Sequence, residues 1–257
     1  MDMEAVDGTD LKNSIGQSEM SAGVALVIGA GGGLGAALVA QLSSAAGESG
    51  AFGSVLALSR GSAPAIDFGN EASLSAAAQW VAVTCAEQQR ELRLLIVASG
   101  FLHGPQGQPE RSFAQLDAEY LGHVFQINAI GPALVMKHFL PLLPKQGRCV
   151  AAFISARVGS IGDNSLGGWY GYRASKAALN QFVKTASVEM TRRNKQSVCM
   201  ALHPGTVDTA LSQPFAKAGL NVRSAVEAAS DLLAVLHAAQ PADTGCLLDY
   251  QGMKLPF

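Results

Sequence analysis

The fold is decided near the N-terminus by the stretch VALVIGAGGGLGAALVAQL, residues 24–42. Its first five residues, Val24–Ile28, are all apolar, which predicts a strand that is buried on both faces. An apolar helical pattern runs from Gly33 to Ser43. The turn between them is built from small residues and ends in the helix start: Gly29, Gly31, Gly32, Gly33, Leu34 and Gly35. A strand, a glycine turn and a helix in this order predict the first unit of an open parallel sheet.

The glycine turn has a chemical interpretation. Glycine lets the backbone turn tightly and approach a pyrophosphate, and the start of a helix offers free N–H groups with a positive dipole. We therefore expect this loop to bind the phosphates of a dinucleotide. A tight turn that binds no ligand is the simpler alternative.

The same alternation of strands and helices continues along the chain. Strands are expected over residues 54–58, 92–98, 148–155, 197–202 and 245–249, and helices over 71–88, 116–143, 172–193 and 222–239. The fold class is therefore α/β, with a single Rossmann-type, doubly wound parallel sheet and helices on both faces. We expect this dinucleotide-binding domain to span residues 22–257. Residues 1–21 carry five acidic residues against one lysine and are expected to form a flexible acidic tail.

Composition excludes several classes of protein. Of the 257 residues, 49% are hydrophobic and 15% are charged, which excludes a mainly disordered chain. A formal net charge of −2 gives no electrostatic basis for binding nucleic acid. The uncharged stretch from Met20 to Gly47 contains too many glycines for a membrane helix, since each costs about 1 kcal/mol relative to alanine. Four scattered cysteines and five histidines show no metal-ligand spacing, so we expect no metal and a cytoplasmic protein with reduced, buried thiols.

A second motif, Tyr172-Arg-Ala-Ser-Lys176, points to acid–base chemistry. A spacing of four places the phenol and the ammonium on one face of a helix. A free tyrosine has a pKa near 10, and a nearby ammonium lowers it. Tyr170 has alanine four residues on and is the weaker candidate.

With its first glycines spaced Gly-x-x-x-Gly-x-Gly and with this Tyr–Lys pair, the chain resembles the short-chain dehydrogenase/reductase family over roughly residues 22–257. The likeness is strongest to the subgroup of the bacterial C-factor signalling protein and the sniffer-type carbonyl reductases. It implies a nicotinamide cofactor, Tyr172 as proton donor or acceptor, and Lys176 as the residue that holds the nicotinamide ribose. Asn128 would anchor a water in a proton relay to that lysine. The family stretch after the sixth strand is matched by Pro204, Gly205, Val207 and Thr209.

The residues after the second strand favour NADPH over NADH. In a dinucleotide fold an acidic residue there would bind the ribose of NAD, whereas this strand is followed by Ser59 and Arg60. An arginine pairs with the 2′-phosphate of NADP, although a solvated surface arginine is the plainer interpretation. The resemblance places Asp67 and Phe68 beside the adenine.

Two family motifs are altered. The Asn-Ala-Gly motif reads Ala98, Ser99 and Gly100 here, so its asparagine is missing. The serine that polarises the substrate carbonyl precedes Gly159 by three residues in the family, and Ala156 stands there. We expect Ser155 to supply the hydroxyl, with Ser160 or no hydroxyl as alternatives, and the loss of one such donor costs about 10²–10³ in rate.

The sequence thus predicts an NADPH-dependent oxidoreductase that interconverts a ketone or aldehyde with an alcohol. Apolar residues in the expected lid, 210–221, and nearby Phe101 and Trp169 favour a hydrophobic small-molecule substrate. A nucleotide-binding regulatory or signalling protein with weak catalysis is the alternative, and a protein that has lost the cofactor is a third. By analogy with the family we also expect a homodimer or homotetramer that pairs through the long helices.

Overall fold

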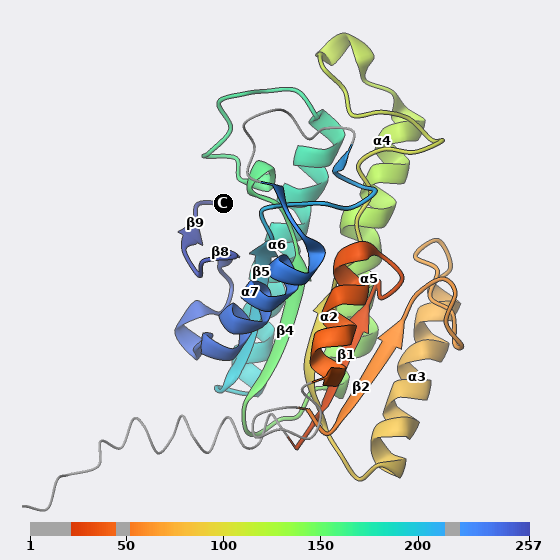
Figure 1. The fold of residues 1–257 in the computed structure, drawn as a ribbon, viewed down its shortest axis with the longest axis vertical. Coiled ribbons are helices and arrows are strands. Elements are labelled where there is room, and N and C mark those ends of the chain that lie inside the picture. Colours follow the sequence, from red (N-terminus) through yellow and green to blue (C-terminus); the bar gives the residue numbers. More distant parts are fainter. Residues whose placement is uncertain (1–21, 45–51, 214–221) are drawn as a thin grey trace, which may run out of the picture.

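The computed structural model describes residues 22–44, 52–213 and 222–257, in which strands and helices alternate (Figure 1). The strands are β1 (Val24–Ile28), β2 (Ser54–Leu58), β3 (Leu92–Val97), β4 (Cys149–Ile154), β5 (Ser197–His203), β6 (Thr206–Val207), β7 (Val222–Arg223), β8 (Leu247–Asp249) and β9 (Lys254–Leu255). The helices are α2 (Gly33–Ser44), α3 (Glu71–Glu87), α4 (Ala118–Phe125), α5 (Gly131–Phe139), α6 (Tyr170–Arg193) and α7 (Ala225–Ala238).

The main sheet has seven strands in the order β2-β1-β3-β4-β5-β8-β9. All neighbours are parallel except β9, which runs antiparallel to β8. The chain order reverses direction at β1, since β2 lies on one side of it and β3 on the other. In such sheets a ligand binds beyond the carboxyl ends of the strands at this switch point. The doubly wound α/β fold predicted from the sequence is confirmed.

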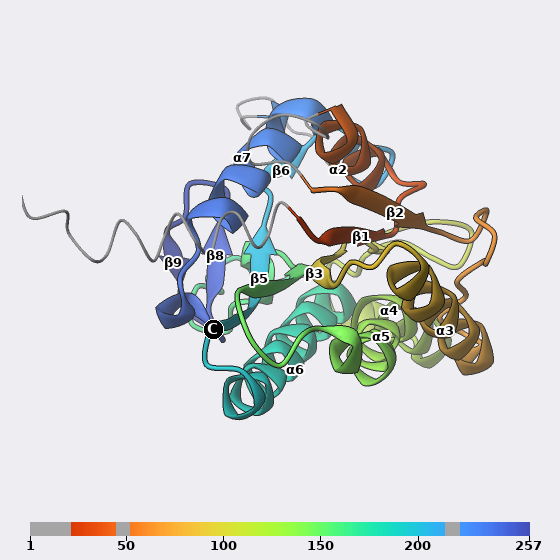
Figure 2. The ribbon, with the colours of Figure 1, turned by 90° about the horizontal axis from the view of Figure 1, so that it is seen from below.

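Helices cover both faces of the sheet, as the view from below shows (Figure 2). Alternate residues of β1 point to opposite faces. Val24, Leu26 and Ile28 pack with α3, α5 and α6, while Ala25 and Val27 pack with α2 and α7. Burial on both faces is the reason these strands read as continuous apolar runs.

Three helices differ from the sequence prediction. The stretch 116–143 is not one regular helix: a π-helical turn, Gln126–Ile130, joins α4 to α5. Helix α6 begins at Tyr170, two residues earlier than expected. Helix α7 begins at Ala225 because Ser224 forms a capping box with Glu227, and the two residues before Ser224 form β7 instead.

Two predicted segments, the acidic tail and the lid, are described only in part or not at all. The predicted acidic tail, residues 1–21, and residues 214–221 of the predicted lid lie outside the described residues.

Within the ranges that are described, none of the helices has the length and apolar character needed to cross a bilayer. All four cysteines are free, and Cys85, Cys149 and Cys199 are buried, as predicted.

Candidate active site

The glycine turn lies at the carboxyl end of β1 and leads into α2. Gly29 has a φ of +92°, which favours glycine, and a β-carbon there would lie 2.8 Å from the Ser99 nitrogen. A β-carbon at Gly35 would lie 2.1 Å from the Gly29 carbonyl oxygen, so helix and turn approach as closely as only glycine allows. Gly31, Gly32 and Gly33 are exposed, and the first turn of α2 contains no acidic residue. The turn therefore presents accessible backbone and a positive helix end to an anion.

The end of β2 provides the predicted phosphate-binding arginine. Arg60 is exposed, and it forms no salt bridge within the described part of the chain. Ser59 precedes it, and the Ser59 hydroxyl accepts a hydrogen bond from the Gly61 nitrogen at 3.2 Å. Asp67 is exposed, and its Oδ1 accepts from the Gly69 nitrogen at 2.8 Å.

Phe68 is placed differently from its neighbour Asp67. Its ring is buried in the core, where a β-carbon on Gly131 of α5 would lie 2.1 Å from it. The Phe68 carbonyl accepts from the Gln126 side chain. The ring thus packs against the start of α5, so it is the backbone of Phe68 that could contact a ligand.

The residues after β3 lie next to the glycine turn, at the carboxyl edge of the sheet. The Ser99 hydroxyl is buried and has no hydrogen-bond partner in the described parts of the chain. A β-carbon on Gly100 would lie 3.8 Å from both the Asn128 Oδ1 and the Lys176 Nζ atoms, and 3.6 Å from Leu211. Ala98 precedes them at the end of the strand. The Ser99 hydroxyl thus lacks a partner within the described residues, and a side chain at Gly100 would begin to fill the space beside Asn128 and Lys176. Both features fit a dinucleotide that lies across the carboxyl ends of the strands. The residues present therefore suit the implied cofactor.

Asn128 sits in the π-helical turn and is fully buried. Its Oδ1 accepts from the Phe101 nitrogen at 2.8 Å, while its Nδ2 donates to the Phe101 carbonyl at 2.8 Å and the Ser175 hydroxyl at 3.1 Å. A π-turn widens a helix and often marks a functional site. Here it points the amide toward the loop after β3 and toward α6.

Tyr172 and Lys176 lie in the first turns of α6, close to Asn128. Tyr172 is 8% exposed and Lys176 is 2% exposed. The Lys176 Nζ atom lies 5.8 Å from the centre of the Tyr172 ring and donates to the Ile154 carbonyl at 2.9 Å. The structure therefore brings Tyr172, Lys176 and Asn128 together at the carboxyl edge of the sheet, whereas Tyr170 is half exposed.

The protonation of this pair differs from the simple expectation. Burial raises the pKa of Tyr172 to about 12, and burial lowers the pKa of Lys176 to about 8. We expected the ammonium to lower the pKa of the phenol. Desolvation has a larger effect on the pKa of Tyr172 than the ammonium does, because both groups are buried and the ammonium donates to the Ile154 carbonyl. At neutral pH the phenol is protonated and the lysine is charged.

Ser155 does not join this group through its hydroxyl. The Ser155 Oγ donates to the Asn180 Oδ1 at 2.7 Å in the buried interface between β4 and α6. Ser160 is also buried, and its Oγ accepts from the Asp163 nitrogen at 3.1 Å. Ala156 is the residue that packs with Tyr172. The side chain next to the phenol at this point is thus a methyl group.

The stretch after β5 closes the other side of the site. Pro204 follows the strand, and Gly205 has a φ of +77° with the Tyr250 ring close by. Val207 is buried. Thr209 packs on the glycine turn, because a β-carbon on Gly33 would lie 2.9 Å from the Thr209 Cγ2. The residues expected to bind the two ends of a dinucleotide therefore all lie along the carboxyl edge of the sheet.

An apolar cluster surrounds the phenol. Leu102 and Ala156 are buried with Tyr172, and Val158, Trp169 and Leu211 pack against them. The Trp169 ring meets the Tyr172 ring edge-on at 6.2 Å between centres. The Phe101 ring packs edge-on against His123 instead. Sequence reasoning missed Leu102, because a single leucine in a loop carries no signal of its own.

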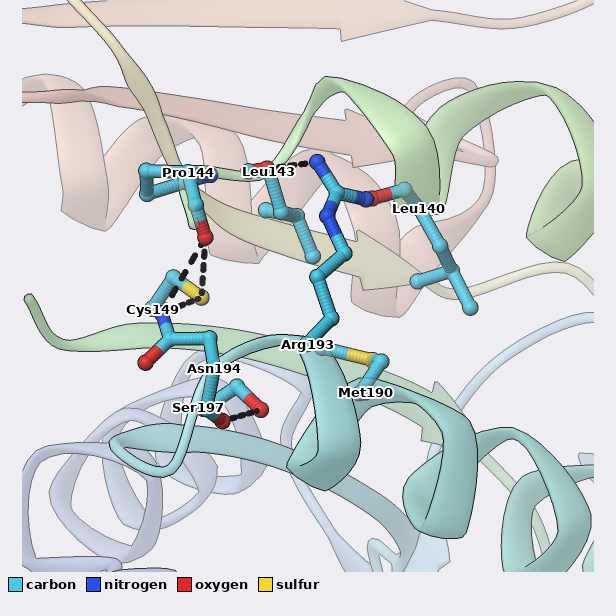
Figure 3. A pocket seen from close by; sticks show the side chains of 8 residues that line it. All are labelled: Leu140, Leu143, Pro144, Cys149, Met190, Arg193, Asn194 and Ser197. Atoms are coloured by element: carbon cyan, nitrogen blue, oxygen red, sulfur yellow. Dashed lines mark hydrogen bonds between the residues drawn. The ribbon is translucent and has the colours of Figure 1, made fainter. Parts of the chain in front are cut away.

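A small pocket lies at the end of the sheet opposite the phenol, and its polar side chains hold the surrounding loops together (Figure 3). It lies where β4 and β5 begin, and Cys149, Arg193 and Asn194 are among the residues that line it. The guanidinium of Arg193 donates to the carbonyls of Leu140, Pro141 and Leu143. The Asn194 amide donates to the carbonyls of Pro144 and Gly147. These bonds tie the loop before β4 to the end of α6, far from the phenol.

Comparison with known proteins gives a consistent result. The sequence model of the family described as short chain dehydrogenase matches residues 23–219. The C-signal protein of Myxococcus xanthus is 35% identical over 143 residues, which is 55% of this chain and 82% of that protein. An uncharacterised oxidoreductase of Schizosaccharomyces pombe is 30% identical over 145 residues, but the match spans only 56% of its length.

Solved structures agree over nearly the whole chain. The NADPH-bound carbonyl reductase from chicken fatty liver superposes with a TM-score of 0.78 at 25% identity, covering 91% of this chain and 98% of that one. A carbonyl reductase from Pseudomonas aeruginosa superposes with a TM-score of 0.67 at 27% identity, covering 91% and 100%.

Proposed function

Because this chain belongs to the short-chain dehydrogenase family and is an oxidoreductase, we propose that it reduces a hydrophobic ketone or aldehyde with NADPH, Tyr172 being the proton donor. The observation that carries the proposal is that the Lys176 Nζ atom lies close to the Tyr172 ring and borders Gly100 together with the Asn128 Oδ1 atom. An exposed arginine after β2 and the NADPH bound by the chicken relative support the choice of cofactor.

The proposed chemistry divides the work between the cofactor and the chain. A bound nicotinamide supplies the hydride. Tyr172 gives its phenolic proton to the carbonyl oxygen, and burial raises the pKa of the phenol, so the protonated form is the one present before the transfer. Lys176, buried and charged, holds the nicotinamide ribose. The Asn128 Oδ1 accepts one hydrogen bond, from Phe101, and a second lone pair is available for a relay water.

The apolar cluster around the phenol supports a hydrophobic substrate. Leu102, Ala156, Trp169 and Leu211 offer methyl, indole and isobutyl surface but no charge. With Ala156 beside the phenol, Tyr172 polarises the carbonyl alone. The absence of one hydroxyl donor predicts turnover about 10²–10³ below that of a site with it.

The presence of Ala156 beside the phenol also favours one alternative function, that of a regulatory protein that binds NADPH. A site with Ala156 at this point and with the Ser155 hydroxyl bound to Asn180 suits a protein that binds NADPH and turns over little. The relative named C-signal is consistent with a regulatory role of that kind.

Oxidation of NADPH and of NADH by a panel of hydrophobic and acidic carbonyls tests the proposal. Tyr172→Phe is the active-site variant, and Tyr170→Phe, on a half-exposed tyrosine two residues away, is the matched control. We expect Tyr172→Phe to lose at least about 10²-fold in kcat while Tyr170→Phe stays near wild type. Tight NADPH binding without turnover of any carbonyl would instead support the regulatory alternative, and higher kcat/KM for acidic carbonyls would contradict the hydrophobic substrate.

A further inference from the structure

Glu110 is a buried acid that the proposed reaction does not use. It lies in the loop between β3 and α4 and is 2% exposed. No salt bridge within the described ranges includes it. A buried carboxylate needs a compensating partner, because its transfer out of water is costly.

The compensation comes from the start of the helix that carries the phenol. Both carboxylate oxygens of Glu110 accept from the Gly171 nitrogen, at 3.2 and 3.1 Å. Trp169, the residue before α6, provides no side-chain cap of its own. The first N–H groups of a helix lack partners inside the helix, and its N-terminus favours negative charge. Glu110 therefore caps α6 from a distant loop.

A second contact fixes the backbone just before the helix. The Glu110 carbonyl accepts from the Trp169 nitrogen at 2.5 Å. Trp169 has a φ of +52°, a conformation that a non-glycine residue keeps only when its surroundings impose it. The ring of Trp169 in turn meets the ring of Tyr172. Glu110 thus holds the residues at positions 169 and 171, and Tyr172 is the next one along.

We propose that Glu110 is a positioning residue for Tyr172, which acts by fixing the first turn of α6. The inference rests on the proposed reductase function. Without the carboxylate, the Gly171 N–H loses its acceptor, and the backbone bond from Trp169 to the Glu110 carbonyl is left as the direct tie to the start of α6. The phenol then shifts relative to the bound carbonyl, and a displacement of about 1 Å can lower the rate 10²-fold.

The test compares Glu110→Ala, Glu110→Gln and Glu110→Asp with Glu119→Gln, an exposed acid on α4, as the matched control. The measurements are kcat, the Kd of NADPH, and the isotope effect on kcat/KM with NADPH deuterated at the transferred position. We expect Glu110→Ala to lower kcat about 10- to 100-fold, to raise the isotope effect and to leave the Kd within about twofold. Glu110→Gln keeps an acceptor oxygen of the same shape and should recover most of the loss.

Several results would overturn the proposal. One is a Glu110→Ala variant with a lower Tm but wild-type kcat and isotope effect, since that describes a stabilising residue only. Another is a parallel loss of NADPH affinity. If Glu110→Ala does not fold, Glu110→Asp carries the test, because its shorter side chain leaves the Gly171 N–H out of reach, and an unchanged kcat would contradict the role.

A fluorescence readout separates this inference from the proposed function. In a Trp80→Phe background, Trp169 is the remaining tryptophan. We expect Glu110→Ala to shift its emission and Glu119→Gln to leave it unchanged. If the wild type reduces no carbonyl, the proposed function fails, and an emission that Glu110→Ala does not shift then overturns the positioning role as well.

Discussion

Replacing Lys176 by methionine tests whether the structure has placed a charged group in a desolvated site. Burial lowers the pKa of Lys176 from its ordinary 10.5 to about 8. The unfolded chain therefore binds more protons than the folded chain between these two values, so stability rises with pH through this window. The cost of the buried charge is fully present below pH 8 and disappears above pH 10.5.

The magnitude follows from the shift. A difference of this size destabilises the folded state by ~3 kcal/mol at pH 7, and by ~1 kcal/mol at pH 10. Methionine has similar length and no charge, so Lys176→Met removes this cost but leaves the Ile154 carbonyl without its donor, at ~1–3 kcal/mol. At pH 7 the variant should be as stable as the wild type or more stable, although it is inactive.

Urea unfolding of both proteins at pH 7, 8, 9 and 10 provides the measurement. We expect the stability of Lys176→Met relative to wild type to fall by ~2–3 kcal/mol from pH 7 to pH 10, as the wild type recovers. Lys184, exposed on the same helix, supplies the control, and Lys184→Met should show no comparable trend. A difference between Lys176→Met and wild type that does not change with pH would refute the reasoning, since the titration of other groups cancels in it.

Two further predictions concern the hydroxyl that the family pattern has and that this chain lacks at position 156. Ser155→Ala should lower the free energy of unfolding by ~1–3 kcal/mol, because the buried Asn180 loses its donor, and should leave kcat within about threefold; a tenfold or greater loss of kcat would make Ser155 the polarising hydroxyl after all. Ala156→Ser places a donor beside Tyr172 and should raise kcat by up to ~10²-fold at constant NADPH affinity, so an unchanged kcat would show that the carbonyl does not lie against this residue.

The order of the strands along the chain and the glycine turn could be predicted from the sequence for a local reason. A strand buried on both faces must be apolar throughout, so Val24–Ile28 and Cys149–Ile154 are visible as runs. Gly29 and Gly35 are visible because only glycine tolerates the approach between turn and helix. The spacing of Tyr172 and Lys176 places both on one face of a helix whatever surrounds it.

The π-turn at Asn128 could not be predicted in this way. Residues 116–143 read as one long helical stretch that contains Gly131-Pro132. In the structure the Asn128 side chain in the π-turn is bonded to partners from other elements, Phe101 and Ser175. The partner of the Ser155 hydroxyl, Asn180, lies on a helix that packs against the strand only in the folded protein.

The sequence by itself determined the glycine turn and the shared helix face of Tyr172 and Lys176, because backbone geometry and helical spacing are local properties. The tertiary structure alone decided how those residues behave. Desolvation by distant segments reverses the expected direction of the pKa of Tyr172, and it is the folded arrangement that sets Glu110 against the first turn of α6. Burial and long-range contact depend on which segments meet, and no stretch of the chain encodes that meeting on its own.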